Sequence, residues 1–182
     1  MAWIPNALTV LRLCLTPVIY LTIAKHEFGL ALALVVFAGF SDWLDGVLAR
    51  RFNWHSRLGS LLDPIADKLL FLAVFVGLTL AELMPLWLAV LAIARDVVIV
   101  VGATAYNFAV ERLTGSATLL SKFNTLVQGV YACVLLALAA TGRDAVWLVR
   151  LLSVALLVTI IASGVHYVIA WSAKAREGAQ HE

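Results

Sequence analysis

The sequence predicts an all-α integral membrane protein with six transmembrane helices. Of its 182 residues, 63% are hydrophobic and 13% are charged, whereas soluble domains average about 45–50% and about 25%. Several apolar runs reach about 20 residues, which is enough for a helix to cross a hydrocarbon core of about 30 Å. No ten-residue segments alternate in polarity as the strands of a membrane barrel do. We therefore expect one transmembrane domain over residues 1–182.

Polar turns divide the chain into six apolar segments, each expected to form a helix. The predicted ranges are residues 5–24, 28–50, 58–82, 86–111, 119–141 and 145–171. Pro5 suits the first turn of a helix, where its missing N–H is not needed. Pro17 is expected to kink the first helix, and the polar tail from Lys174 onward is expected to fray. An even number of spans places both termini on one side of the membrane.

Four aspartates stand out in residues 42–67, DWLDGVLARRFNWHSRLGSLLDPIAD. Asp42 and Asp45 are three residues apart and Asp63 and Asp67 four apart, so each pair shares one helical face. Carboxylates gathered in an apolar region repel one another, so they must be protonated, paired with bases or neutralised by cations. The region has too few bases to pair them all. Carboxylate oxygens favour Mg²⁺, Mn²⁺ or Ca²⁺ over zinc, and two such ions would balance four aspartates.

Small residues accompany both aspartate pairs. Gly46 and Ala49 lie on the helical face of the first pair, where they leave room for a ligand, and Arg50 follows at the predicted helix end. Gly59 precedes Asp63 by one turn and clears space in the same way.

The first segment has polar residues at its beginning, namely Asn6, Thr9 and Arg12. Two interpretations remain open. Either these residues cap the helix while the arginine extends toward the membrane surface, or they contact the headgroups bound at the aspartates.

Charged and polar side chains also occur inside later segments. Arg95 and Asp96 lie mid-span, where a charge costs at least about 2.5–3.5 kcal/mol and so indicates a functional site; a structural ion pair is the alternative. Because adjacent helical residues do not face each other, each is expected to need a separate partner. Polar residues after residue 119 trace one face that is expected to line the interior: Ser121, Asn124, Thr125 and Gln128.

Basic residues are distributed unevenly between the two predicted sides of the membrane. The side of the termini holds Arg12, Arg50, Arg51, Arg57, Lys68, Arg112, Lys122, Lys174 and Arg176. The other side holds Lys25, Arg143 and Arg150. Because basic residues accumulate on the cytoplasmic side, we expect the termini and the aspartates to face the cytoplasm across an inner or cytoplasmic membrane.

The pattern Asp42-x2-Asp45-Gly46-x2-Ala49-Arg50-x8-Gly59-x3-Asp63-x3-Asp67 resembles the signature of the CDP-alcohol phosphatidyltransferase family, with every fixed position at the family's spacing. The resemblance implies a catalytic domain that transfers a phosphatidyl group from CDP-diacylglycerol to an alcohol and releases CMP. It implies two divalent metal ions, Mg²⁺ or Mn²⁺, bound by Asp42, Asp45, Asp63 and Asp67, with Asp67 also the general base. It further implies CDP binding by Gly46, Ala49, Arg50, Gly59, Asn6 and Thr9.

The acceptor alcohol is predicted from the second half of the chain. Arg95-Asp96-Val97 and Ser121-Lys122-Phe123-Asn124-Thr125-x2-Gln128 resemble family members that make cardiolipin from phosphatidylglycerol. Enzymes that use glycerol phosphates typically have a Gly-Lys-x-Lys-Thr type run, and here Asn124 replaces one lysine. Fewer bases suit a phosphodiester. The acceptor-binding residues are expected to be Arg95, Lys122, Asn124 and Arg112. The alternative acceptor is glycerol-3-phosphate, which would give phosphatidylglycerophosphate.

The expected partners are CDP-diacylglycerol, a lipid or glycerol-phosphate acceptor, membrane lipids and a second copy in a homodimer, with no nucleic acid. Two functions outside this enzyme class are alternatives. A membrane ion or proton-coupled transporter would use intramembrane charges, but it leaves the fixed Gly, Ala and Arg positions unexplained. A lipid-binding structural protein would have no use for clustered aspartates.

Overall fold

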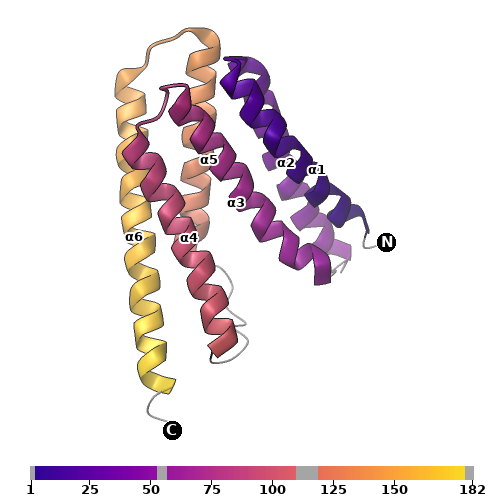
Figure 1. Ribbon diagram of the computed structural model, residues 1–182, viewed down its shortest axis with the longest axis vertical. Coiled ribbons are helices and arrows are strands. Elements are labelled where there is room, and N and C mark those ends of the chain that lie inside the picture. Colours follow the sequence, from indigo (N-terminus) through magenta and orange to yellow (C-terminus); the bar gives the residue numbers. More distant parts are fainter. Residues whose placement is uncertain (1–2, 53–56, 110–118, 179–182) are drawn as a thin grey trace. The chain divides into compact units, whose positions relative to one another are not determined.

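The computed structural model of the chain describes residues 3–52, 57–109 and 119–178, with side chains described for residues 7–44, 46–47, 51, 63, 65–101 and 119–167. Every element in these ranges is a helix (Figure 1). The helices are α1 (Trp3–Ala24), α2 (Phe28–Phe52), α3 (Arg57–Leu80), α4 (Leu86–Ala109), α5 (Leu119–Thr141) and α6 (Val146–Gly178).

The six predicted helices are confirmed, and most of their ends agree with the predictions to within two residues. The exception is the C-terminal tail, because α6 continues to Gly178 where fraying was expected from Lys174. The tail is rich in Ala, Lys, Arg and Glu, which are strong helix formers and need no packed face to remain helical for two more turns. Pro17 lies inside α1 without ending it; whether it kinks the helix stays a prediction.

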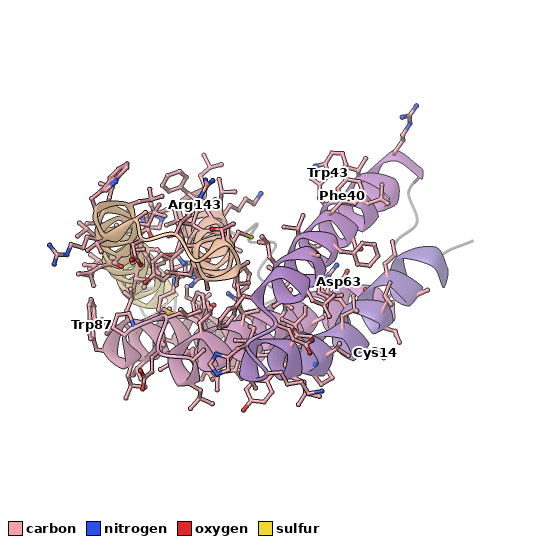
Figure 2. The ribbon with its side chains drawn as sticks, turned by 90° about the horizontal axis from the view of Figure 1, so that it is seen from above. Cys14, Phe40, Trp43, Asp63, Trp87 and Arg143 are labelled. Atoms are coloured by element: carbon pink, nitrogen blue, oxygen red, sulfur yellow. The ribbon has the colours of Figure 1, made fainter. Side chains whose placement is uncertain are left out.

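The described residues support insertion into a membrane. Three stretches are long and apolar enough to span one, namely Ala7–Ala24, Leu119–Thr141 and Val146–Tyr167, and Phe28–Leu44 forms a shorter apolar helix. Large apolar side chains such as Trp43 and Phe40 are more than half exposed; Figure 2 shows both pointing outward from α2. Such surfaces suit lipid, which solvates them without cost. The chain is therefore an all-helical integral membrane protein, and the crossing of all six helices stays a prediction.

The helices form two compact units, and the first contains the aspartates. It comprises Met1–Pro85 and Ala132–Ala145, and in it α1 packs against both α2 and α3. Ile19 and Ile23 of α1 are fully buried. A Cβ added at Gly77 of α3 would lie 3.2 Å from Cγ2 of Ile23, so this glycine permits the close approach of α1 and α3.

The second unit comprises Leu86–Tyr131 and Val146–Glu182. In it α4 packs against α6, with Leu88 of α4 and Leu156 of α6 fully buried. Tyr131 of α5 is also fully buried, and its hydroxyl lies 3.1 Å from the Ser153 hydroxyl. The expectation of a single domain over residues 1–182 stays a prediction.

The helices α1, α3 and α5 end in the same way. His26, Glu82 and Gly142 each adopt a left-handed conformation, with φ of 60°, 59° and 63°. The residue after each one donates its N–H to a carbonyl five residues earlier: Glu27 to Thr22, Leu83 to Leu78, and Arg143 to Leu138. These are Schellman caps, which satisfy the last carbonyls of a helix. Two of the three left-handed positions are not glycine, although glycine adopts this conformation most readily.

We predict that Glu82→Gly raises the free energy of unfolding by about 1 kcal/mol, because a left-handed conformation costs an L-residue about 1–2 kcal/mol. Thermal unfolding in detergent measures the change. Glu82→Ala is the matched control, since it removes the same side chain and keeps the strained conformation. Gly142→Ala is expected to lower the unfolding temperature. Equal unfolding temperatures for Glu82→Gly and Glu82→Ala would contradict the prediction.

Candidate active site

The carboxylates of Asp42 on α2 and Asp67 on α3 both bind one arginine of α1. Nη2 of Arg12 lies 2.8 Å from Oδ1 of Asp42, and Nη1 lies 2.5 Å from Oδ1 of Asp67. The Arg12 side chain is fully buried, whereas those of Asp42 and Asp67 are 45% and 37% exposed. A single guanidinium therefore joins one member of each predicted aspartate pair, with a different terminal nitrogen contacting each carboxylate.

A third aspartate, Asp63, is also held by α1. The hydroxyl of Thr9 donates a hydrogen bond to Oδ1 of Asp63, and Thr9 is fully buried. Thr9 and Arg12 are three residues apart and so share one face of α1. Figure 2 shows Asp63 inside the bundle that α1 forms with α2 and α3. This face of α1 thus gathers three of the four predicted aspartates.

The burial of Arg12 contradicts one of the two interpretations that the sequence left open for the first helix, and the other, contact with bound headgroups, stays a prediction. A side chain extending to the membrane surface would be exposed, but that of Arg12 is 0% exposed and paired. The interpretation as a surface-seeking arginine is therefore wrong, because two carboxylates offer it a stronger partner than water. Thr9 binds an aspartate, and its contact with CDP stays a prediction.

Several predicted residues lie outside the described side chains or residues. Helices α1–α3 include the positions of Asn6, Asp45, Ala49, Arg50 and Gly59. The side chains of the first four, and the surroundings of Gly59, lie outside the described side chains. Arg112 lies outside the described residues altogether. Gly46 lies one turn after Asp42 on α2 and is partly exposed.

The donor atoms of the described aspartates are of the kind that binds divalent cations. Their ligand atoms are hard carboxylate oxygens, which Mg²⁺ and Mn²⁺ prefer. Arg12 offers one positive charge to Asp42 and Asp67 together, and Asp63 accepts from a neutral hydroxyl. The exposed fractions of Asp42 and Asp67 leave both reachable by a ligand. Among the described side chains, however, no three acidic, histidine or cysteine groups form a closed metal site.

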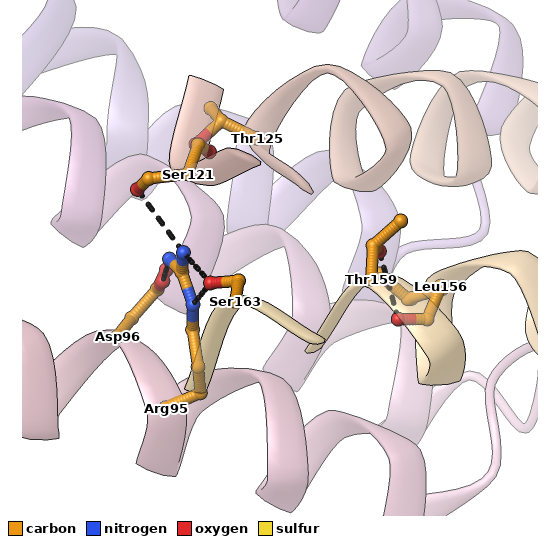
Figure 3. A network of polar contacts seen from close by, with 7 residues as sticks. All are labelled: Arg95, Asp96, Ser121, Thr125, Leu156, Thr159 and Ser163. Carbon is orange, nitrogen blue, oxygen red and sulfur yellow. Dashed lines mark hydrogen bonds and ion pairs between the residues drawn. The ribbon is translucent and has the colours of Figure 1, made fainter. Parts of the chain in front are cut away.

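A second polar cluster lies in the other unit and surrounds Arg95 of α4 (Figure 3). Its Nε donates to the Ser163 hydroxyl at 2.7 Å, Nη1 to Oδ1 of Asp96 at 2.7 Å, and Nη2 to the Ser121 hydroxyl at 3.0 Å; Nη2 also contacts Ser163. Both Arg95 and Asp96 are buried. The cluster therefore ties α4 to α6 and to the start of α5.

The geometry of this cluster corrects one prediction. Arg95 and Asp96 were expected to need separate partners, but they bind each other. The spacing rule describes the direction of Cβ atoms, whereas the long arginine side chain places Nη1 2.7 Å from Oδ1 of its neighbour. Sequence reasoning also missed Ser163, whose only signal was a small hydroxyl within a long apolar helix. Acceptor binding by Arg95 stays a prediction.

The polar stripe of α5 lines the interior as predicted. Asn124 and Gln128 are both 0% exposed, and the hydroxyl of Thr125 donates to the Ser121 carbonyl at 3.2 Å. Lys122 lies between stripe positions and is exposed. The predicted acceptor residues of this helix thus comprise one buried amide and one exposed cation.

Comparison with known proteins identifies the family that the aspartate pattern resembles. A family model for CDP-alcohol phosphatidyltransferases matches residues 2–172. A Streptomyces coelicolor protein named cardiolipin synthase (CMP-forming) is 45% identical over 104 residues, covering 54% of this chain and 48% of that protein. The human protein of the same name is 38% identical over 143 residues, covering 69% and 47%.

A third relative extends over almost the whole chain. A Schizosaccharomyces pombe protein named as a cardiolipin synthase (CMP-forming) / mitochondrial hydrolase fusion is 35% identical over 183 aligned residues, covering 91% of this chain and 30% of that protein. This chain spans about half the length of the bacterial and human relatives.

We predict that Arg12→Gln lowers the free energy of unfolding by about 1–3 kcal/mol, since it removes two charged hydrogen bonds that are partly screened by solvent. Mg²⁺ is expected to raise the unfolding temperature of this variant more than that of the unsubstituted chain, because a cation then neutralises carboxylates that have lost their guanidinium. Thermal unfolding in detergent, with and without Mg²⁺, measures both effects.

Arg143→Gln is the control for Arg12→Gln, because Arg143 is exposed in the turn after α5 and its loss should change neither value. Equal stabilisation of all three proteins by Mg²⁺ would contradict the assignment of Arg12 as a charge partner at a cation site.

Proposed function

This chain belongs to the CDP-alcohol phosphatidyltransferase family, and from that premise we propose that it makes cardiolipin. The reaction transfers the phosphatidyl group of CDP-diacylglycerol to a hydroxyl of phosphatidylglycerol and releases CMP. The observation that carries the proposal is the attachment of Asp42, Asp63 and Asp67 to one face of α1. Two helices of an otherwise apolar unit present these carboxylates together, and such grouping is costly unless a cationic or phosphate-bearing ligand uses it.

Asp67 acts as the general base. The acceptor hydroxyl gives its proton to the Asp67 carboxylate while its oxygen forms a bond to the phosphatidyl phosphorus. The bond between that phosphorus and the CMP oxygen breaks, and CMP leaves with the electron pair. Arg12 holds Asp67 at 2.5 Å and so fixes the orientation of the base. No covalent intermediate with the protein is needed.

The aspartates Asp42, Asp45, Asp63 and Asp67 would hold two divalent cations, Mg²⁺ or Mn²⁺. When bound, these ions supply positive charge against the diphosphate and the leaving oxygen. The hydrogen bond from Thr9 fixes the orientation of Asp63. The CDP moiety would contact Gly46, Ala49, Arg50 and Gly59, with Asn6 and Thr9 on the side of α1.

Phosphatidylglycerol is preferred over glycerol-3-phosphate as the acceptor for two reasons. The relatives described above are named cardiolipin synthases. The described start of α5 also supplies one lysine, Lys122, and an amide, Asn124, in place of a second lysine, and fewer cations suit a phosphodiester better than a phosphomonoester of nearly two charges. Arg95 and Arg112 complete the proposed acceptor-binding set.

The enzyme would work in an inner or cytoplasmic membrane, with its termini and aspartates facing the cytoplasm, because basic residues gather on that side. The CDP-linked substrate and the acceptor lipid would both reach it from the membrane. Assembly as a homodimer is part of the same proposal.

The product of the reaction tests the proposed acceptor. Purified protein in mixed micelles with CDP-diacylglycerol and Mg²⁺ is offered phosphatidylglycerol or glycerol-3-phosphate in separate reactions. We expect cardiolipin and an equal amount of CMP with phosphatidylglycerol, identified by mass spectrometry. Formation of phosphatidylglycerophosphate instead would show that glycerol-3-phosphate is the acceptor. Absence of CMP release with both acceptors would favour a transporter.

We predict that Asp67→Asn lowers kcat by about 10²–10⁴-fold, the usual contribution of a general base, because an amide cannot take the acceptor proton. Radiolabelled CMP release measures the rate, and circular dichroism confirms that the variant is folded. Asp144→Asn, in the exposed turn before α6, is the matched control and should keep full activity. Full activity of Asp67→Asn would remove the assignment of the base.

A further inference from the structure

Arg12 of α1 occupies carboxylate oxygens that the proposed cations would also use. Its Nη2 lies 2.8 Å from Oδ1 of Asp42, and its Nη1 lies 2.5 Å from Oδ1 of Asp67. Both aspartates are proposed ligands of the divalent cations. A guanidinium and a divalent cation are both positive, so each weakens the binding of the other to the same carboxylates. Arg12 therefore competes with the cations for these two aspartates.

The two contacts of Arg12 differ in strength. The contact with Asp42 is the longer one, at 2.8 Å against 2.5 Å, and the Asp42 side chain is 45% exposed against 37% for Asp67. Attraction between charges falls with distance and with exposure to solvent. The contact with Asp42 is therefore the weaker of the two and the one that cations displace more readily. Asp67, the proposed general base, keeps its contact with Nη1.

The nitrogen that leaves Asp42 needs another acceptor. The Arg12 side chain is 0% exposed, and a buried charge that loses one of its partners destabilises the protein strongly. The proposed reaction brings a diphosphate to these aspartates, and its oxygens carry negative charge. Arginine binds phosphate through strong charged hydrogen bonds. The diphosphate of the substrate can therefore take the place of the Asp42 carboxylate as the acceptor for Nη2.

We propose that Arg12 exchanges Asp42 for the diphosphate of the CDP-linked substrate while it keeps its contact with Asp67. The exchange rests on the proposed function and adds to it a role for Arg12 in the order of binding. Without substrate, Arg12 lowers the affinity of the aspartates for cations. With substrate, the guanidinium binds phosphate and Asp42 is left to the cations. Cations and diphosphate thus favour the binding of each other, because one arginine responds to both.

The test measures two binding constants of Arg12→Gln in detergent. The first is the Kd for Mn²⁺ without nucleotide, obtained from the electron paramagnetic resonance signal of free Mn²⁺. The second is the Kd for CDP at saturating Mn²⁺, obtained by calorimetry. CDP carries the diphosphate but no lipid to transfer, so no turnover occurs during the measurement.

The two constants are expected to change in opposite directions. Mn²⁺ should bind Arg12→Gln about tenfold more tightly than the unsubstituted chain, a change within the usual range for coupled sites, because its competitor is gone. CDP should bind about tenfold more weakly, as the loss of one charged hydrogen bond implies. A residue that only supported the packing of α1 would weaken the binding of both ligands when replaced.

Arg12→Lys is the second variant, and it retains the positive charge. A lysine has one ammonium nitrogen, so it cannot contact two carboxylates through different nitrogens as arginine does. Both constants are expected to lie between those of the unsubstituted chain and of Arg12→Gln, so this variant also tests the exchange if the glutamine variant does not fold. Arg143→Gln, in the exposed turn after α5, is the control and should change neither constant.

The contrary results are distinct. Weaker binding of both Mn²⁺ and CDP by the Arg12 variants shows a structural role and overturns the exchange. Tighter binding of Mn²⁺ with unchanged binding of CDP shows that Arg12 does not contact the diphosphate, which also overturns it. Both results leave the proposed function intact. An unsubstituted chain that binds neither Mn²⁺ nor CDP overturns the proposed function together with the exchange.

Discussion

The contact of Arg12 with Asp42 and Asp67 is the interaction on which the first unit depends. An unpaired charge inside a membrane costs at least about 2.5–3.5 kcal/mol. Asp42 lies in the second half of α2, and Asp67 lies in the first half of α3. The guanidinium of α1 lies within 2.8 Å of a carboxylate from each helix, so α1 must pack against both, as it does. Packing and charge compensation thus both favour α1 lying against α2 and α3. Gly77 of α3 allows the close approach of α1 at Ile23.

The two units satisfy their polar groups by different means. In the first unit, one buried cation is shared by two partly exposed carboxylates, which leaves negative charge able to attract cations. In the second unit, the guanidinium of Arg95 is surrounded by Asp96, Ser121 and Ser163, so its charge is compensated internally. The first arrangement suits the binding of metal ions and a diphosphate. The second fixes the start of α5 and therefore the direction in which its polar face points.

The sequence predicted the helices well because apolar length and polar turns determine them almost locally. It also predicted that spacings of three and four residues place the aspartates of each pair on one helical face, and Asp63 and Asp67 do both contact α1, whereas the side chain of Asp45 lies outside the described residues. It could not assign a partner to Arg12, because its contacts with Asp42 and Asp67 join residues 30 and 55 positions apart along the chain and have no local pattern. The prediction for Arg95 and Asp96 failed because spacing rules describe where a side chain begins and not how far a long one reaches.

The residues proposed to carry out the reaction and those proposed to bind the acceptor differ in their chemistry. Deprotonation and phosphoryl transfer need charged groups held in fixed orientation, which Thr9 and Arg12 provide for the aspartates of α2 and α3. Among the residues proposed to bind the acceptor, Asn124 of α5 differs from this set, because it is a buried neutral amide that can both donate and accept hydrogen bonds.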